Sequence, residues 1–276
     1  MKYYFSLLRR ETRNARMGIL LSALLVLVAS QVLARYVKQW DADLVRYVGA
    51  LLAQLHLVAG FLRELFRAVP TITEDAFGHL LPQPERKSLL AVVCSLLFSA
   101  FLYMISSIVL ELLHEFLQTH SLQAVRQGLT AFSPQLLLLH LPVALLELLF
   151  LITLVMALQL LLHRLGQRFH LAGKVPTVVG RVFAFFCTIG LCCFWIWVAN
   201  NVMLRFPWYL DVLQGTLVNT RPATFIMQNF WMSGLQVSEE GRSVWSVAVL
   251  GGMFLLTILQ WVFSLILVED HLDWEV

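Results

Sequence analysis

The sequence predicts an all-α integral membrane protein, a polytopic bundle of about six transmembrane helices. Two observations lead to this prediction. Of the 276 residues, 59% are hydrophobic and only 13% are charged, whereas soluble domains carry about 25% charged residues. The apolar residues also gather in long runs, several of them about as long as the roughly 20 residues that a helix needs to cross a bilayer.

The predicted spans form one membrane domain over residues 1–276. They cover residues 17–34, 48–66, 89–112, 136–162, 182–204 and 244–268. The second is short and contains Gln54 and His56, so a five-span form with an interfacial helix at this place is the alternative. Lys and Arg favour six spans. With both termini in the cytoplasm, thirteen basic residues fall on the inner side and seven on the outer side, as the positive-inside rule requires. We therefore expect a multi-pass protein of the cell inner (plasma) membrane.

The segment between the last two spans, residues 205–243, is too apolar for a solvated loop. We expect two short amphipathic helices that lie in the membrane interface. A re-entrant element that lines a path is the alternative, because irregular backbone at membrane depth occurs where it is buried in protein or borders a cavity.

Glu111, His114 and Glu115 form a polar group near the end of the third apolar run. Their spacing places all three on one helical face. Counting about 1.5 Å per residue from Ser88 predicts that they mark the point where the helix leaves the membrane. A metal or proton site is the alternative, although Glu-x-x-His is only half of a di-iron pattern and no second copy occurs.

Glu147 differs because it lies twelve residues into its predicted span, near the middle of the membrane. An ionised carboxylate at that depth costs about 2.5–3.5 kcal/mol. Two interpretations stay open. The carboxyl group belongs to an ion, proton or substrate path together with His56, His140 or His114, or it is a structural polar contact between helices.

Several classes of chemistry lack their motifs. There is neither a phosphate-binding G-x-x-x-x-G-K-[ST] loop nor a G-x-S-x-G nucleophile elbow. We therefore predict no enzymatic activity, no catalytic residue, no cofactor and no resident metal. An intramembrane enzyme is the alternative, and only the group of Glu111, His114 and His140 approaches the paired polar residues that it would need. We expect no nucleic-acid partner.

Three segments carry a resemblance to a known family. The basic stretch YYFSLLRRETRNARMG precedes the first span, a loop at residues 66–88 separates the second and third spans, and residues 205–243 separate the last two. This order resembles the membrane subunit of ABC-2-type exporters, in which an elbow helix, a cytoplasmic coupling loop and a re-entrant outer hairpin occupy these places. The resemblance extends over the whole chain in segment order and includes no family sequence motif.

The resemblance implies a permease subunit of an exporter that a separate cytoplasmic ATPase energises. The contact with that ATPase would then involve four residues of the coupling loop: Glu74, Asp75, Phe77 and His79. The alternative is a non-catalytic scaffold or assembly subunit of a secretion, conjugation or envelope-building complex. In either case the partners are the lipid bilayer and other subunits, and a homodimer is left open.

Overall fold

The computed structural model describes most of the chain. The described residues are 2–36, 41–73, 85–119, 121, 123, 134–168, 177–201, 206–211, 214–220, 222–224, 235–238 and 243–269. They divide into two compact units, Met1–Phe132 (unit 1) and Ser133–Val276 (unit 2), where the sequence predicted one membrane domain. Each unit is described below by itself.

The prediction of a polytopic helix bundle is confirmed. Unit 1 contains α1 (Lys2–Tyr36), α2 (Ala42–Thr73) and α3 (Glu85–Thr119), and unit 2 contains α5 (Pro134–Arg168), α6 (Thr177–Asn201) and α7 (Val247–Glu269). Among the described residues, six helices are long and apolar enough to cross a membrane, over Ala15–Tyr36, Ala42–Arg67, Leu89–Thr119, Leu141–Leu162, Val182–Ala199 and Val247–Leu267. The second span is therefore a full-length helix and not a short interfacial one.

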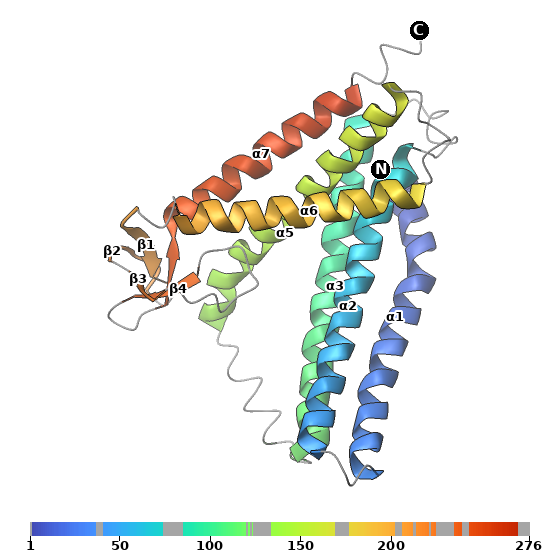
Figure 1. Ribbon diagram of the computed structural model, residues 1–276, viewed down its shortest axis with the longest axis vertical. Helices are drawn as coiled ribbons and strands as arrows, with labels where there is room; N and C mark the ends of the chain where they lie inside the picture. The colour runs from blue at the N-terminus through green and yellow to red at the C-terminus, as the bar shows by residue number, and fades with distance from the viewer. Residues whose placement is uncertain are drawn as a thin grey trace. The chain divides into compact units, whose positions relative to one another are not determined.

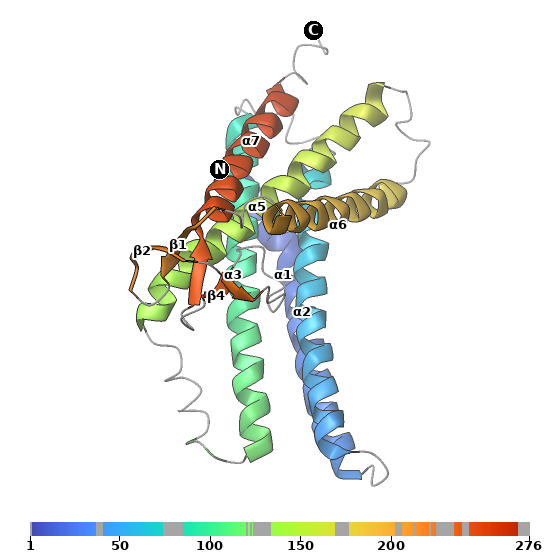
Figure 2. The same cartoon turned by 60° about the vertical axis from the view of Figure 1, so that its left-hand side comes forward.

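The three helices of unit 1 lie side by side along their length (Figures 1 and 2). Arg16 of α1 contacts Ser99 of α3, and Gln31 of α1 contacts His114 of α3. Both pairs are separated by 83 residues, so α1 and α3 run parallel in a fixed register. The partners of α1 on α2 instead move backwards, from Glu64 opposite Arg16 to His56 opposite Ser22, so α2 is antiparallel to both.

Small residues allow α1 and α2 to approach closely. A β-carbon added at Gly49 would lie 2.0 Å from Cβ of Ser30, and one at Gly60 would lie 2.8 Å from the side chain of Ile19. Ala53 lies between these glycines on α2 and is buried. Small residues at such spacings are typical of helix interfaces in membranes, where close backbone contact supplies much of the attraction.

The core of unit 2 is apolar and joins its three helices. Phe150 and Leu154 of α5, Trp195 of α6, and Val249 and Met253 of α7 form a buried cluster. The rings of Phe150 and Trp195 are 5.7 Å apart between centroids, within the range of favourable aromatic pairs. This cluster fixes α6 and α7 against α5.

A five-stranded antiparallel sheet connects α6 to α7. Its strands are β1 (Trp208–Asp211), β2 (Leu217–Asn219), β3 (Pro222–Thr224), β4 (Leu235–Ser238) and β5 (Ser243–Ser246), in the order β2-β1-β5-β4-β3. Tyr209 and Trp245 are fully buried. Strand β5 continues directly into α7 (Figure 1), where the hydroxyl of Ser246 accepts a hydrogen bond from the amide of Val249 and caps the helix.

This sheet corrects the prediction for residues 205–243. Two short helices were expected there, but the described residues of the segment form strands and the turns between them, and none of them is helical. The turn between β1 and β2 shows the physical reason. Gly215 adopts a left-handed backbone with φ of 64°, and the carboxylate of Asp211 accepts the amide proton of Gln214. Such Asp and Gly positions interrupt a helix and close a hairpin.

The segment that was expected to form a separate elbow helix is part of α1. Residues 3–18 are helical, but they belong to the same continuous helix as the first span, since α1 extends from Lys2 to Tyr36. No separate helix precedes the first span among the described residues.

The close approach of α1 and α2 gives a stability prediction. We expect Gly49→Ala to lower the free energy of unfolding by about 1–3 kcal/mol, because the new methyl group collides with Ser30 and overpacks the interface. The matched control is Gly18→Ala on α1, where a β-carbon would meet no atom within 4 Å. That change should be neutral or stabilise the helix by up to about 1 kcal/mol. Denaturation by sodium dodecyl sulfate in mixed micelles measures both, and equal effects would contradict this account of the interface.

Candidate functional site: a polar seam through helices α1 to α3

Polar side chains of unit 1 pair with one another at successive levels along α1, α2 and α3. We call this set the polar seam. Its members are Arg16, Ser22 and Gln31 of α1, Gln54, His56 and Glu64 of α2, and Ser99, Tyr103, Ser107 and His114 of α3. From Arg16 to Gln31 the seam extends about 22 Å along the helix axis, which is most of the roughly 30 Å of a hydrocarbon core.

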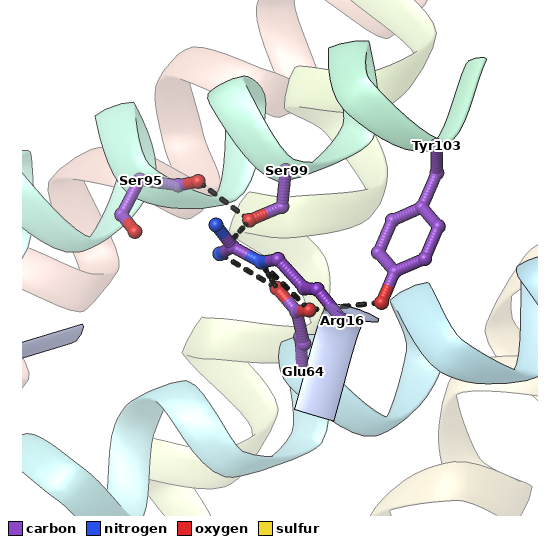
Figure 3. A network of polar contacts seen from close by, with 5 residues as sticks. All are labelled: Arg16, Glu64, Ser95, Ser99 and Tyr103. Atoms are coloured by element: carbon purple, nitrogen blue, oxygen red, sulfur yellow. Dashed lines mark hydrogen bonds and ion pairs between the residues drawn. The ribbon is translucent and has the colours of Figure 1, made fainter. Parts of the chain in front are cut away.

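The first level of the seam is a buried ion pair (Figure 3). The guanidinium Nε of Arg16 donates to both carboxylate oxygens of Glu64, at 2.9 and 3.0 Å, and Nη2 lies 2.8 Å from Oε2. The hydroxyl of Tyr103 donates to Oε1 of Glu64 at 2.9 Å. Because a carboxylate offers about four acceptor positions, Glu64 is close to saturated.

Ser99 completes this first level on α3. Nη2 of Arg16 also donates to Ser99 Oγ, which itself donates to the carbonyl oxygen of Ser95 at 2.9 Å. Arg16 is 9% exposed, Glu64 is 6% exposed and Ser99 is fully buried. The pair is neutral as a whole and carries several charge-assisted hydrogen bonds, which is the condition under which a buried ion pair is tolerated.

The absence of a side chain at Gly60 of α2 leaves room for the hydroxyl of Tyr103. A β-carbon at Gly60 would lie 3.1 Å from the Tyr103 hydroxyl, so this hydroxyl occupies the space that a side chain would fill. Gly60 is one turn from Glu64 in one direction and one turn from His56 in the other. The aromatic ring also meets Phe61 edge to face, with centroids 6.4 Å apart. The Tyr103 hydroxyl therefore lies between the first level and the middle of the seam.

Two pairs form the middle of the seam. Nε2 of His56 is 2.6 Å from Oγ of Ser22. The side-chain amide of Gln54 donates to the Ser107 carbonyl at 3.1 Å, and Ser107 Oγ donates back to Oε1 of Gln54 at 2.5 Å. His56 is exposed at the surface of the structure. This is unusual, because ionisable side chains within membrane spans almost always face the interior of the bundle or a cavity.

Gln31 and His114 form the last level. Nε2 of Gln31 is 3.1 Å from Nδ1 of His114. Gln31 is buried and His114 is half-buried. On α3 the seam residues follow one another at intervals of four, four and seven residues, which places all of them on one face of the helix.

The register of α1 and α3 places the His114 group near the ends of both helices. Counting from Ser88 placed Glu111, His114 and Glu115 where α3 leaves the membrane. In the structure His114 is level with Gln31, and each lies five residues before the end of the apolar stretch of its helix, at Thr119 and Tyr36. The prediction that this group marks the end of the span stays a prediction.

The other predicted site residues are divided between the two units. Glu147 is 7% exposed and buried in unit 2, whereas His56, Glu111 and His114 belong to unit 1, and Glu111 is exposed. In unit 2 the hydroxyl of Thr153 donates to Oε1 of Gln260 at 2.7 Å, a polar contact between α5 and α7. The side chain of His140 lies outside the described residues, as do four residues of the predicted coupling loop: Glu74, Asp75, Phe77 and His79.

The most strongly bonded residues of the seam were not predicted from the sequence. Arg16 stands among the basic residues that set topology, and Glu64, Ser99 and Tyr103 had no predicted role. A signal was present, because Ser95, Ser99, Tyr103 and Ser107 recur every four residues in an otherwise apolar run. Such spacing marks one polar face on a buried helix.

The chemistry of the seam is that of hydrogen bonds and charge. In the part of the chain that the structure describes, no group of three His, Cys, Asp or Glu side chains could hold a metal ion. The seam offers one buried ion pair, two imidazole rings and three amide or hydroxyl pairings. These are groups that can pass protons, orient polar molecules or hold helices together.

Comparison with known proteins adds no assignment: no protein-family model, no curated protein and no solved structure matches this chain.

The first level of the seam gives a prediction about stability. We expect Arg16→Met alone to cost about 3–5 kcal/mol of unfolding free energy, because it leaves the Glu64 carboxylate buried without its counter-charge. Replacing both partners, in Arg16→Met with Glu64→Met, should recover most of this loss. Unfolding titrations of the two single variants and the double variant form a double-mutant cycle. A double variant as unstable as the sum of the single ones would contradict the pairing.

Proposed function

We propose that this chain is the membrane-spanning subunit of a transport complex. The observation that supports this most directly is the polar seam. Ionisable and hydrogen-bonding side chains inside membrane spans are costly and rare, and where they occur they commonly mark the routes of ions, protons or polar substrates. In unit 1 they occur at successive levels over about 22 Å of helix.

Unit 2 contributes further polar groups at membrane depth. Glu147 and Gln159 of α5 are buried, and Thr153 of the same helix bonds to Gln260 of α7. Each unit thus combines three spans with polar side chains inside them. Transporters are often built from two such sets of spans.

The energy source that we propose is an ATPase on a separate chain at the inner (plasma) membrane, as in the ABC-2-type exporters. The support is the order of the spans and the loop between α2 and α3. Two other parts of the resemblance are weakened, because α1 has no separate elbow helix and the segment before α7 contains strands. The proposed contact with the ATPase remains the loop with Glu74, Asp75, Phe77 and His79.

A second candidate is a scaffold subunit of a membrane complex. It is favoured by the near-saturation of Glu64, whose carboxylate bonds to Arg16 and Tyr103. Saturated polar contacts of this kind hold helices together and do not need to move anything. The two candidates differ in whether the middle of the seam has a role beyond stability.

Purification of the complex from native membranes in mild detergent, followed by mass spectrometry, tests the proposal. We expect a stoichiometric ATPase to accompany the chain. In proteoliposomes, Gln54→Leu should lower the ATP turnover of that complex by roughly tenfold, the effect of about 1.4 kcal/mol on a barrier, because it removes both contacts with Ser107 at mid-seam.

The matched control is Leu55→Ala on the exposed face of the same helix, which should leave turnover unchanged. Co-purification of envelope or secretion components without an ATPase would instead support the scaffold. An assembled complex in which Gln54→Leu turns over ATP like the parent would remove the transport role of the seam.

A further inference from the structure

The two histidines of the seam, His56 and His114, differ in the hydrogen bonds that they make with their partners. Nδ1 of His114 faces the side-chain nitrogen of Gln31 at 3.1 Å. An amide NH₂ group donates hydrogen bonds and cannot accept them. Nδ1 must therefore be the acceptor, and the ring of His114 is neutral with its proton on Nε2.

His56 is bonded in the other sense. The Ser22 hydroxyl lies 2.9 Å from the Gly18 carbonyl, 3.0 Å from the Ile19 carbonyl and 2.6 Å from Nε2 of His56. When the hydroxyl proton is directed to the backbone of α1, the Ser22 oxygen accepts a hydrogen bond from Nε2. A donor at Nε2 exists in both the neutral ring and the imidazolium, so this contact tolerates a positive charge.

Charged groups of two helices act on His114. Burial of the ring has the largest effect and opposes a positive charge, Arg46 of α2 opposes it as well, and Glu111 and Glu115 of α3 favour it to a smaller extent. Arg46 is itself paired with Asp43, whose carboxylate lies 3.0 Å from Nη1. On α1 the nearest charge in sequence to Gln31 is Arg35, one turn further along and exposed. The two carboxylates therefore offset only part of the cost of a positive ring at this level, so protonation of His114 loads the contact between α1 and α3.

We propose that His114 is a proton-binding site that controls the contact between α1 and α3. A proton on Nδ1 places two donors face to face, so the Gln31 amide must turn to present its oxygen, or the helices must separate at this level. Histidine changes charge between about pH 5 and pH 8, and protonation of buried histidines is a known means of switching helix contacts. The site responds to protons whether the chain belongs to a transporter or to a scaffold.

Spin labels on the full chain in lipid nanodiscs test the proposal. The four native cysteines are replaced by alanine, and labels are attached at Val32→Cys on α1 and Gln118→Cys on α3, both of which are exposed. Pulsed electron paramagnetic resonance measures the distribution of distances between the two labels at pH 5.5 and at pH 8. We expect the distribution to shift or to gain a second population at the lower pH.

Three further variants give the test its specificity. His114→Gln keeps an uncharged partner for Gln31 and should abolish the pH dependence, whereas His56→Gln should retain it. Gln31→Met removes the amide donor and should also abolish it, while a histidine-labelled sample still shows His114 taking up a proton by nuclear magnetic resonance. Identical distributions at both pH values in the parent, or a pH dependence that survives His114→Gln, would overturn the proposal.

Discussion

The ion pair between Arg16 and Glu64 is the contact on which unit 1 depends. It joins α1 to α2, and through Ser99 and Tyr103 it includes α3. Its position fixes the register of all three helices, because a buried guanidinium can meet a carboxylate and a serine hydroxyl only at one relative height. The levels above it follow from helix geometry, since each helix advances by the same 1.5 Å per residue. The need to pair the buried charges therefore also determines how the three helices of this unit are aligned.

The helices could be predicted from the sequence and the seam only in part. Long apolar runs predict membrane-spanning helices, because a helix satisfies its own backbone hydrogen bonds in lipid, and the distribution of Lys and Arg favoured six spans over five. His56 and His114 were recognised because histidine is unusual in such runs. Arg16 was not, because a basic residue beside the first apolar run has an ordinary explanation as a topology signal. Only the fold shows that Arg16 and Glu64 meet, and 48 residues separate them.

The sheet before α7 was missed for a different reason. Its strands contain three or four residues each, too few to establish an alternation of period two. Aromatic residues such as Trp208 and Trp245 also suit an interfacial helix. The decisive information is long-range, because β1 pairs with β5 across more than thirty residues, with Leu210 opposite Trp245. A local pattern cannot contain such a pairing.

The register of α1 and α3 has a consequence for the surrounding lipid. Ser99 is level with Arg16, yet the apolar run of α3 begins ten residues earlier, at Leu89, while that of α1 begins only at Met17. At the other end the apolar stretches are level, with Thr119 of α3 opposite Tyr36 of α1, so the stretch of α3 has 31 residues against 22 in α1, a difference of about 14 Å along the axis. Neighbouring spans of such unequal length do not both match a flat bilayer, and the mismatch is relieved by tilting of the helices or by a local change in membrane thickness. The thickness of the bilayer, which depends on its lipid composition, then affects the tilt of the unit 1 helices in the membrane.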